Sequence, residues 1–143
     1  MKKLKVLVFP CGSECGLEIG RSFRNLKEVE LFGASSVNDH GKFVFSNYIG
    51  GVPFANADNF IKVLNEIIEA NRIDYVYPSM DSVVFVLAHA ESKLKAKIIG
   101  SPAKTTSIAY SKKETYTVLS DVVKCPHLFK LEELKDSDFP VFM

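Results

Sequence analysis

Short apolar runs alternate with longer amphipathic segments along much of the chain. The apolar run over 4–9 and the alternating run over 28–32 each end at a proline or glycine turn, which is typical of strands. Over 59–72, apolar residues recur every three or four positions and predict an amphipathic helix. The positions that form this apolar face are Phe60, Ile61, Leu64, Ile67 and Ile68.

The same patterns predict the remaining elements. Further helices are expected over 14–25, 82–95, 105–110 and 111–123, with one helical turn over 131–134. Further strands are expected over 74–77 and 97–99. The segment 34–56 is rich in Gly, Asn and Ser and is expected to be irregular, with a short strand over 42–45 and a loop over 47–51.

Polar residues ahead of the predicted helices are candidate helix caps. Asn56 or Asp58 is placed to cap the helix over 59–72, and Ser79 or Asp81 the helix over 82–95. Ser111, with a glutamate three residues later, forms a capping-box pattern that predicts the helix over 111–123.

Strands that alternate with amphipathic helices indicate a mostly parallel sheet with right-handed crossovers and helices on both faces. The sequence therefore predicts a three-layer, Rossmann-like α/β fold. Such sheets bind ligands at the carboxyl ends of their strands. Those ends are expected at residues 10–16, 33–38, 78–82 and 100–105.

Length, charge and cysteine content narrow the class of protein. The 143 residues suit one domain, or one domain with a short extension. The net charge of +1 offers no electrostatic footprint for nucleic acid or an anionic membrane. The apolar run over 6–9 is too short for a signal peptide or a membrane span. Three cysteines are too few for a disulfide framework, so we expect a cytoplasmic protein.

The segment 10–16 follows the first predicted strand and opens a helix, where glycines and free amides suit an anionic ligand. Its glycines, Gly12, Gly16 and Gly20, are spaced by four, unlike the G-x-G-x-x-G dinucleotide fingerprint. Glu14 and Glu18 would also repel a phosphate, and Phe32-Gly33-Ala34 lacks the acidic residue expected after the second strand. A dinucleotide site, another small-ligand site, and a purely structural turn with close packing at Gly20 are the alternatives.

Cysteine and histidine residues do not form a strong metal or catalytic pattern. The spacings of Cys11 to Cys15 and of Cys125 to His127 are not those of a zinc site. Neither does the sequence assign a histidine partner to a catalytic cysteine. We therefore interpret the thiols as having no chemical role.

Several short motifs follow one another in an order that resembles a known family. They are Pro10-x-Gly12, the segments 71–78, 98–101 and 111–116, Pro126, and the apolar run over 139–143. The order resembles the N-terminal pre-ATP-grasp domain of ATP-grasp enzymes, close to the carbamoyl-phosphate synthase large-subunit type. The resemblance covers nearly the whole chain. It implies a pre-ATP-grasp domain over 1–110, followed over 111–143 by a connecting helix and the start of an ATP-grasp domain.

This resemblance implies an ATP-dependent ligase that activates a carboxylate as an acyl-phosphate, which an amine-type nucleophile then attacks. ATP and magnesium would be the cofactors, and the magnesium ligands would belong to an ATP-grasp domain that follows. Lys112 matches the lysine of the family's Asp-Lys motif, which reaches the ATP phosphates in several members; Ser111 stands in place of the aspartate. Gly12, Ser13, Gly16, Ser79 and Asp81 match loops that face the small-molecule substrate. No catalytic residue is expected in this chain, which would be inactive alone.

Two other functions fit the same sequence. The chain can be a stand-alone Rossmann-like module that binds a small molecule or a nucleotide. It can also be an interaction module that buries the strand-like run over 139–143 against a partner or, as a homodimer, against a second copy.

Overall fold

The computed structural model describes residues 3–141 of the chain. Five strands form one sheet in the order β3-β2-β1-β4-β5, and each neighbouring pair is parallel. The strands are β1 (Leu4–Phe9), β2 (Val29–Ala34), β3 (Asn47–Ile49), β4 (Tyr75–Pro78) and β5 (Lys97–Ile98). The helices are α1 (Glu14–Phe23), α2 (Gly41–Val44), α3 (Phe60–Asn71), α4 (Asp81–His89), α5 (Ala103–Tyr110) and α6 (Lys112–Leu119).

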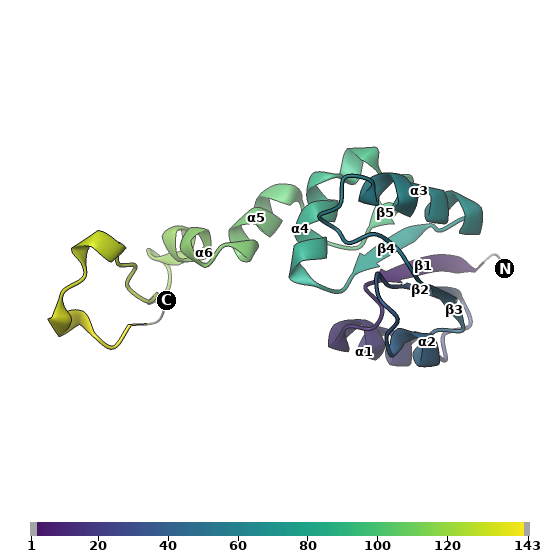
Figure 1. The fold of residues 1–143 in the computed structure, drawn as a ribbon, viewed down its shortest axis with the longest axis horizontal. Coiled ribbons are helices and arrows are strands. Elements are labelled where there is room, and N and C mark those ends of the chain that lie inside the picture. Colours follow the sequence, from purple (N-terminus) through teal and green to yellow (C-terminus); the bar gives the residue numbers. More distant parts are fainter. Residues whose placement is uncertain (1–2, 142–143) are drawn as a thin grey trace.

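The sheet lies between two layers of helices (Figure 1). Helices α1 and α2 cover one face, and α3 and α4 cover the other, with α5 packed against α4. The α/β, Rossmann-like, three-layer fold predicted from the alternation of strands and helices is thereby confirmed.

The central strand β1 supplies side chains to both layers because successive residues of a strand point to opposite faces. Leu7 and Phe9 join the larger core, where the Phe9 ring lies 5.3 Å from that of Phe60 in α3. Val8 joins the smaller core with Phe45, under α1. A strand segment buried on both faces is apolar, which explains the uninterrupted apolar run over 6–9, where every residue is buried.

Two predictions for the segment 34–56 were wrong. Residues 42–44 of the strand predicted over 42–45 lie instead in the short helix α2, and just before it Asp39 Oδ1 accepts a hydrogen bond from the Gly41 amide at 2.9 Å. Residues predicted as a loop over 47–51 contain strand β3, which pairs with β2. The Asn47 side chain donates to the Leu31 carbonyl at 3.1 Å, so a long-range contact decides a strand that local composition does not favour.

The predicted helix caps are partly wrong. Met80 is the N-cap of α4 and Asn59 that of α3, and neither makes a side-chain capping bond. Helix α4 also ends earlier than predicted, at His89, before a 3₁₀ turn over Glu91–Lys93. Ser111 does cap α6, accepting from the Glu114 amide at 3.2 Å, but the Ser111 amide donates to the Ser107 carbonyl, so only this half of the capping box forms. Helix α6 ends at Leu119, earlier than predicted.

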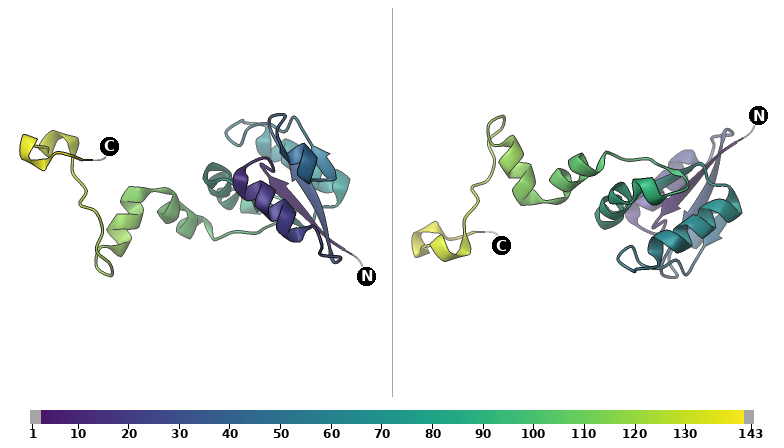
Figure 2. Two further views of the ribbon diagram at one scale, coloured as in Figure 1. Left: turned by 90° about the horizontal axis from the view of Figure 1, so that it is seen from below. Right: turned by 90° about the horizontal axis from the view of Figure 1, so that it is seen from above.

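Residues 111–141 form what we call the C-terminal arm, which extends away from the sheet (Figures 1 and 2). It comprises α6 and two 3₁₀ turns, Leu131–Glu133 and Asp136–Asp138. None of the arm side chains that the structure describes is buried. The strand predicted over 139–143 is absent from 139–141, and residues 142 and 143 lie outside the described range.

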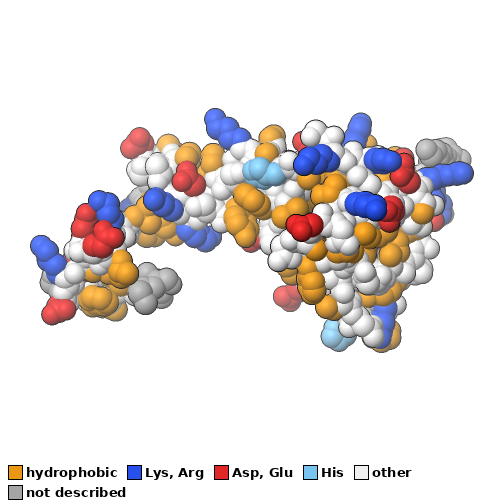
Figure 3. All heavy atoms as spheres, turned by 45° about the horizontal axis from the view of Figure 1, so that its top comes forward, with side chains coloured by type: hydrophobic (Ala, Val, Ile, Leu, Met, Phe, Trp, Pro, Cys, Tyr) orange, Lys and Arg blue, Asp and Glu red, His pale blue; other side chains and the backbone are white. Residues whose placement is uncertain are grey.

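Hydrophobic side chains lie on the surface of the arm between its charged ones (Figure 3). Val122 and Leu131 are among the most exposed of them. No helix in the described part of the chain is both long enough and apolar enough to cross a membrane.

Candidate cavity at the carboxyl edge of the sheet

A cavity of about 650 Å³ opens at the carboxyl edge of the sheet. The loops after β1, β2 and β4 form its rim, and α4 and the end of α5 close one side. Strand β1 lies between β2 and β4, so the chain turns to opposite sides of the sheet at this point. Open α/β sheets bind ligands at such switch points, and the volume lies within the range of small-molecule sites.

The walls of the cavity are mostly apolar. Aromatic rings come from four different elements and loops: Phe9, Phe54, Phe85 and Tyr110. The Phe85 and Tyr110 rings lie 4.7 Å apart and join α4 to the end of α5. Serine hydroxyls supply most of the polar rim, and among the described residues that line the cavity only Asp39 is charged.

Asp39 is held in place by three neighbours. Ser35 Oγ donates a hydrogen bond to its Oδ2, and the Gly41 amide donates to its Oδ1 at 2.9 Å. Gly12 lies directly against the carboxyl group, because a Cβ atom built at Gly12 would be only 2.0 Å from Asp39 Cγ. A residue with any side chain at position 12 would therefore displace Asp39 from the cavity wall.

Cys11 lies behind this carboxylate and is fully buried, with its Sγ 3.6 Å from Ser35 Oγ. Burial raises the pKa of the Cys11 thiol to about 11, with Asp39 contributing in the same direction. The thiol is therefore protonated at neutral pH and unsuited to nucleophilic attack. This agrees with the interpretation of the thiols as chemically inert at this position.

The pKa of Tyr48 is also raised, first by loss of solvation and then by the charge of Asp39. Its hydroxyl donates to the Val37 carbonyl at 3.1 Å.

Among the described residues, no group of three or more His, Cys, Asp or Glu side chains is arranged to hold a metal ion.

Ser13 and Ser79 link the loops that follow β1 and β4 by a hydrogen bond. Their hydroxyl oxygens are 2.8 Å apart, and Ser79 Oγ donates to the Pro10 carbonyl at 2.7 Å. Ser13 Oγ also accepts from the Gly16 amide at 3.0 Å and caps α1. These hydrogen bonds fix the spacing of the two loops across the switch point.

Gly16 has a structural role in the same turn. A Cβ atom there would lie 2.7 Å from the carbonyl oxygen of Pro10 and 2.8 Å from that of Cys11. Close packing at Gly20, one of the alternatives for this segment, is present too: its neighbours are Val44 and Phe45. Neither glycine lines the cavity.

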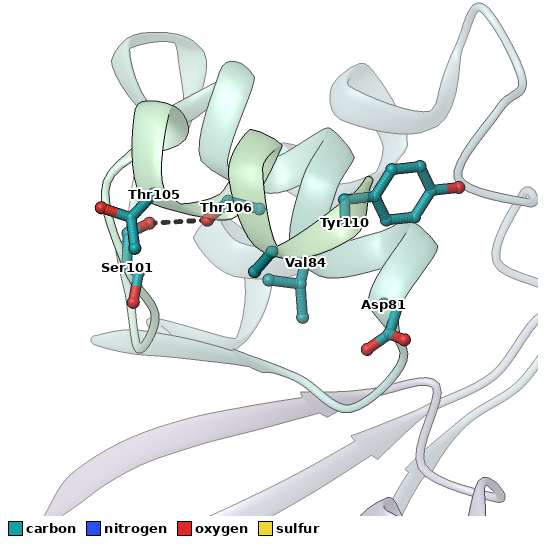
Figure 4. A pocket seen from close by; sticks show the side chains of 7 residues that line it. Asp81, Val84, Ser101, Thr105, Thr106 and Tyr110 are labelled. Carbon is teal, nitrogen blue, oxygen red and sulfur yellow. Dashed lines mark hydrogen bonds between the residues drawn. The ribbon is translucent and has the colours of Figure 1, made fainter. Parts of the chain in front are cut away.

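Asp81 borders a second, smaller cavity of about 160 Å³ between α4 and α5 (Figure 4). Val84, Ser101 and Thr105 lie around this cavity, and Thr106 Oγ1 donates to the Ser101 carbonyl at 3.2 Å. Tyr110 borders both cavities, but Asp81 does not line the larger one.

Lys112 is the first residue of α6 and is exposed on the C-terminal arm. It lines neither of the two cavities. Helix α6 packs on α5, and Thr115 Oγ1 donates to the Ile108 carbonyl at 2.7 Å. Of the residues predicted to face a ligand, the structure thus brings Gly12, Ser13 and Ser79 together and leaves Asp81 and Lys112 apart from them.

The residues that give the cavity its chemistry are not among the candidates predicted from the sequence. Asp39 lies in the segment 34–56, which is expected to be irregular, although it follows the carboxyl end of a strand among many polar residues. That position was the available signal. Phe54, Phe85 and Tyr110 carried none, because their meeting depends on how α4, α5 and the loop before α3 pack together.

Comparison with known proteins supports the fold. A scan against protein-family models matches none, and a search of curated proteins finds no significant match. Sixteen chains among the solved structures do match. One is glycinamide-RNase-transformylase T from Mycobacterium tuberculosis, with a TM-score of 0.61 and 13% sequence identity.

The match to this transformylase covers 85% of the present chain and 36% of the other. The chain therefore spans little more than a third of that protein's length. At this level of identity the likeness shows a shared fold: an α/β domain of the Rossmann-like class, here with a ligand-sized cavity at its switch point.

Proposed function

We propose that this chain is the N-terminal, substrate-side domain of an ATP-dependent ATP-grasp ligase, and that it is inactive alone. The observation that carries the proposal is the preformed cavity at the carboxyl edge of a fold shared with a transformylase. That transformylase is an ATP-grasp-family enzyme with a pre-ATP-grasp domain at its N-terminus. The closer likeness to carbamoyl-phosphate synthase rests on the order of the sequence motifs.

ATP and magnesium would serve the complete enzyme rather than bind in this cavity. The residues present do not fit a triphosphate, because no lysine or arginine lines the cavity within the described part of the chain. A single carboxylate, Asp39, is also a poor ligand set for magnesium, which prefers several oxygen donors. The sites for both would then belong to other parts of the complete enzyme.

The chain's own contribution would be to bind the acceptor substrate and to exclude water around it. An acyl-phosphate is hydrolysed by water, so the acceptor must be held free of water where it can attack the acyl-phosphate from outside the phosphate's own site. The aromatic walls would enclose the acceptor, and the hydrogen bond between Ser13 and Ser79 holds the rim in one geometry.

Lys112 is the residue proposed to reach the ATP phosphates of the complete enzyme. Its position at the start of α6 places the ammonium group on the arm, away from the acceptor cavity. In the complete enzyme, Lys112→Ala should raise the KM for ATP and lower kcat, by about tenfold or more for loss of a charged contact. Lys113→Ala, one position later on the same helix, is the matched control and should leave both constants near their original values.

The first test is the intact mass of the native protein. A mass well above the 15.9 kDa of this chain supports a multidomain ligase. A mass equal to it would reject the ligase and favour the second candidate, a stand-alone binding module, because the cavity is lined entirely from this chain.

The second test is ADP formation with a panel of amines and carboxylates. The complete protein should form ADP only when a matching pair of substrates is present, and the 143-residue chain should form none. ADP formation by the chain alone, or its absence from the complete protein with every pair, would contradict the proposal.

A further inference from the structure

The charge of the cavity at the carboxyl edge limits what it can bind. Asp39 is its one charged residue within the described part of the chain, and no lysine, arginine or histidine lines it. A phosphate or carboxylate placed there would face a like charge without a compensating cation. Such a pairing is unfavourable, most of all in a partly desolvated site.

The helix end beside the cavity does not compensate for this. Helix α1 starts at the rim, where an uncapped N-terminus would attract an anion. Here Ser13 Oγ already accepts from the Gly16 amide at 3.0 Å, and Glu14 adds a negative charge to the first turn. The position at which Rossmann-like folds often hold a phosphate is therefore unsuited to one in this chain.

Asp39 is well placed to receive a cation instead. Its two oxygens each accept one hydrogen bond, from Ser35 Oγ and from the Gly41 amide, so the carboxylate is oriented before a ligand arrives. A carboxylate oxygen accepts two hydrogen bonds, which leaves capacity for an ammonium group. Gly12 lies against the carboxyl group without a side chain to cover it.

The opposite walls suit an apolar body attached to that ammonium group. Phe9, Phe85 and Tyr110 supply ring surfaces, which also attract cations. Phe54 and Met80 are 62% and 49% exposed and would lose contact with water when a ligand binds.

We propose that this cavity binds a cationic amine with an apolar or aromatic body and without a phosphate group, and that Asp39 is the residue that pairs with the ammonium. The inference names the substrate class of the proposed acceptor site and to that extent rests on the proposed function. The binding itself needs no ATP and no further domain, so it is tested separately.

The test uses three probes that share a phenyl ring and differ in charge: 2-phenylethylamine, 2-phenylethanol and 3-phenylpropanoate. Each is titrated into the ¹⁵N-labelled chain at neutral pH, and binding is followed by amide chemical shifts. We expect the amine to bind about tenfold more tightly than the alcohol, the usual size of a charged hydrogen bond, and the anion more weakly than either. The shifts should centre on the amides of Gly12, Ser35 and Asp39.

Asp39→Asn is the variant that removes the charge while keeping the size of the side chain. It should bind the amine and the alcohol equally well. Asp121→Asn, an exposed carboxyl group on the C-terminal arm that does not line the cavity, is the matched control and should keep the preference for the amine. If Asp39→Asn does not fold, the comparison of the three probes on the original chain still decides, since it needs no variant.

The inference would be overturned if the amine did not bind, or if it bound no more tightly than the alcohol. It would also be overturned if the anion bound more tightly, or if the shifts centred away from the cavity. These outcomes are distinct from failure of the proposed function. Amine binding in a protein whose intact mass equals that of this chain would uphold the inference and reject the ligase. If the complete protein formed ADP with a non-amine acceptor and the amine did not bind in this cavity, the ligase would be upheld and the inference rejected.

Discussion

The sheet domain over 3–110 and the C-terminal arm over 111–141 differ in how far they bury their apolar side chains. Leu64 in α3 is 0% exposed, whereas Leu131 in the arm is 75% exposed. The sheet domain is held by burial on both faces of the sheet, and the arm by local hydrogen bonds such as the Ser111 cap and the packing of α6 on α5. A leucine therefore stabilises this fold only where a second layer covers it.

The largest expected effect comes from truncating the same side chain in the two regions. Leu64→Ala should lower the free energy of unfolding by about 2–5 kcal/mol, because it leaves a cavity in the larger core. Leu131→Ala should change it by less than about 0.5 kcal/mol. Urea denaturation followed by circular dichroism measures both. A comparable loss for Leu131→Ala would show that the arm is packed like the sheet domain.

The second prediction concerns two glycines of the sheet domain, Gly16 and Gly100. Gly16→Ala places a Cβ atom 2.7 Å from the Pro10 carbonyl oxygen, a backbone atom that cannot move aside easily. We expect a loss of about 1–3 kcal/mol from this overpacking. Gly100→Ala is the control, since its Cβ atom would meet only Ile98 Cγ2, at an ordinary 3.5 Å. Thermal unfolding of the two variants checks the difference, and equal melting temperatures would contradict it.

The smallest effect concerns the buried and the arm cysteines. Burial raises the pKa of Cys11 from 9.0 to about 11, so the unfolded chain loses this proton first as the pH rises. The contribution to stability is complete below about pH 9 and falls as the pH rises toward 11, by about 1 kcal/mol at pH 10.

Unfolding in urea at a series of pH values between neutral and 10 measures this contribution. Cys11→Ser removes the titrating group, so its stability should depend less on pH than that of the original chain, whatever its absolute value. Cys125→Ser, in the arm, retains Cys11 and should keep the original dependence. An unchanged slope in Cys11→Ser would show that another group is responsible.

Much of the fold was predictable because its signals are local. The apolar run over 4–9 and the three- to four-residue spacing over 59–72 each specify an element without reference to the rest of the chain. The errors fell in the segment 34–56, where composition favours neither a strand nor a helix. A long-range contact, the pairing with β2, decides strand β3, whereas α2 begins beside a local hydrogen bond from the Gly41 amide to Asp39.

The candidate site was predictable only in its location. The rule that ligands bind at the carboxyl ends of parallel strands places it near Gly12 and Ser13, and the structure confirms a cavity there. Ser79 was expected as a helix cap or a substrate contact; it does not cap α4, whose N-cap is Met80, and its hydroxyl bonds to Pro10 and Ser13. A hydroxyl can satisfy either partner, and the sequence holds no information on which is nearer.

The order of apolar and polar residues is sufficient to establish the strands, the helices and the class of fold, because each depends on the spacing of neighbours along the chain. The chemistry of the cavity depends instead on the sheet order β3-β2-β1-β4-β5. That order brings Asp39 against Gly12, and the packing of α5 on α4 brings Tyr110 near Phe85. Contacts of this kind come from the packing of layers, which no local pattern encodes, and they decide that the cavity carries one negative charge.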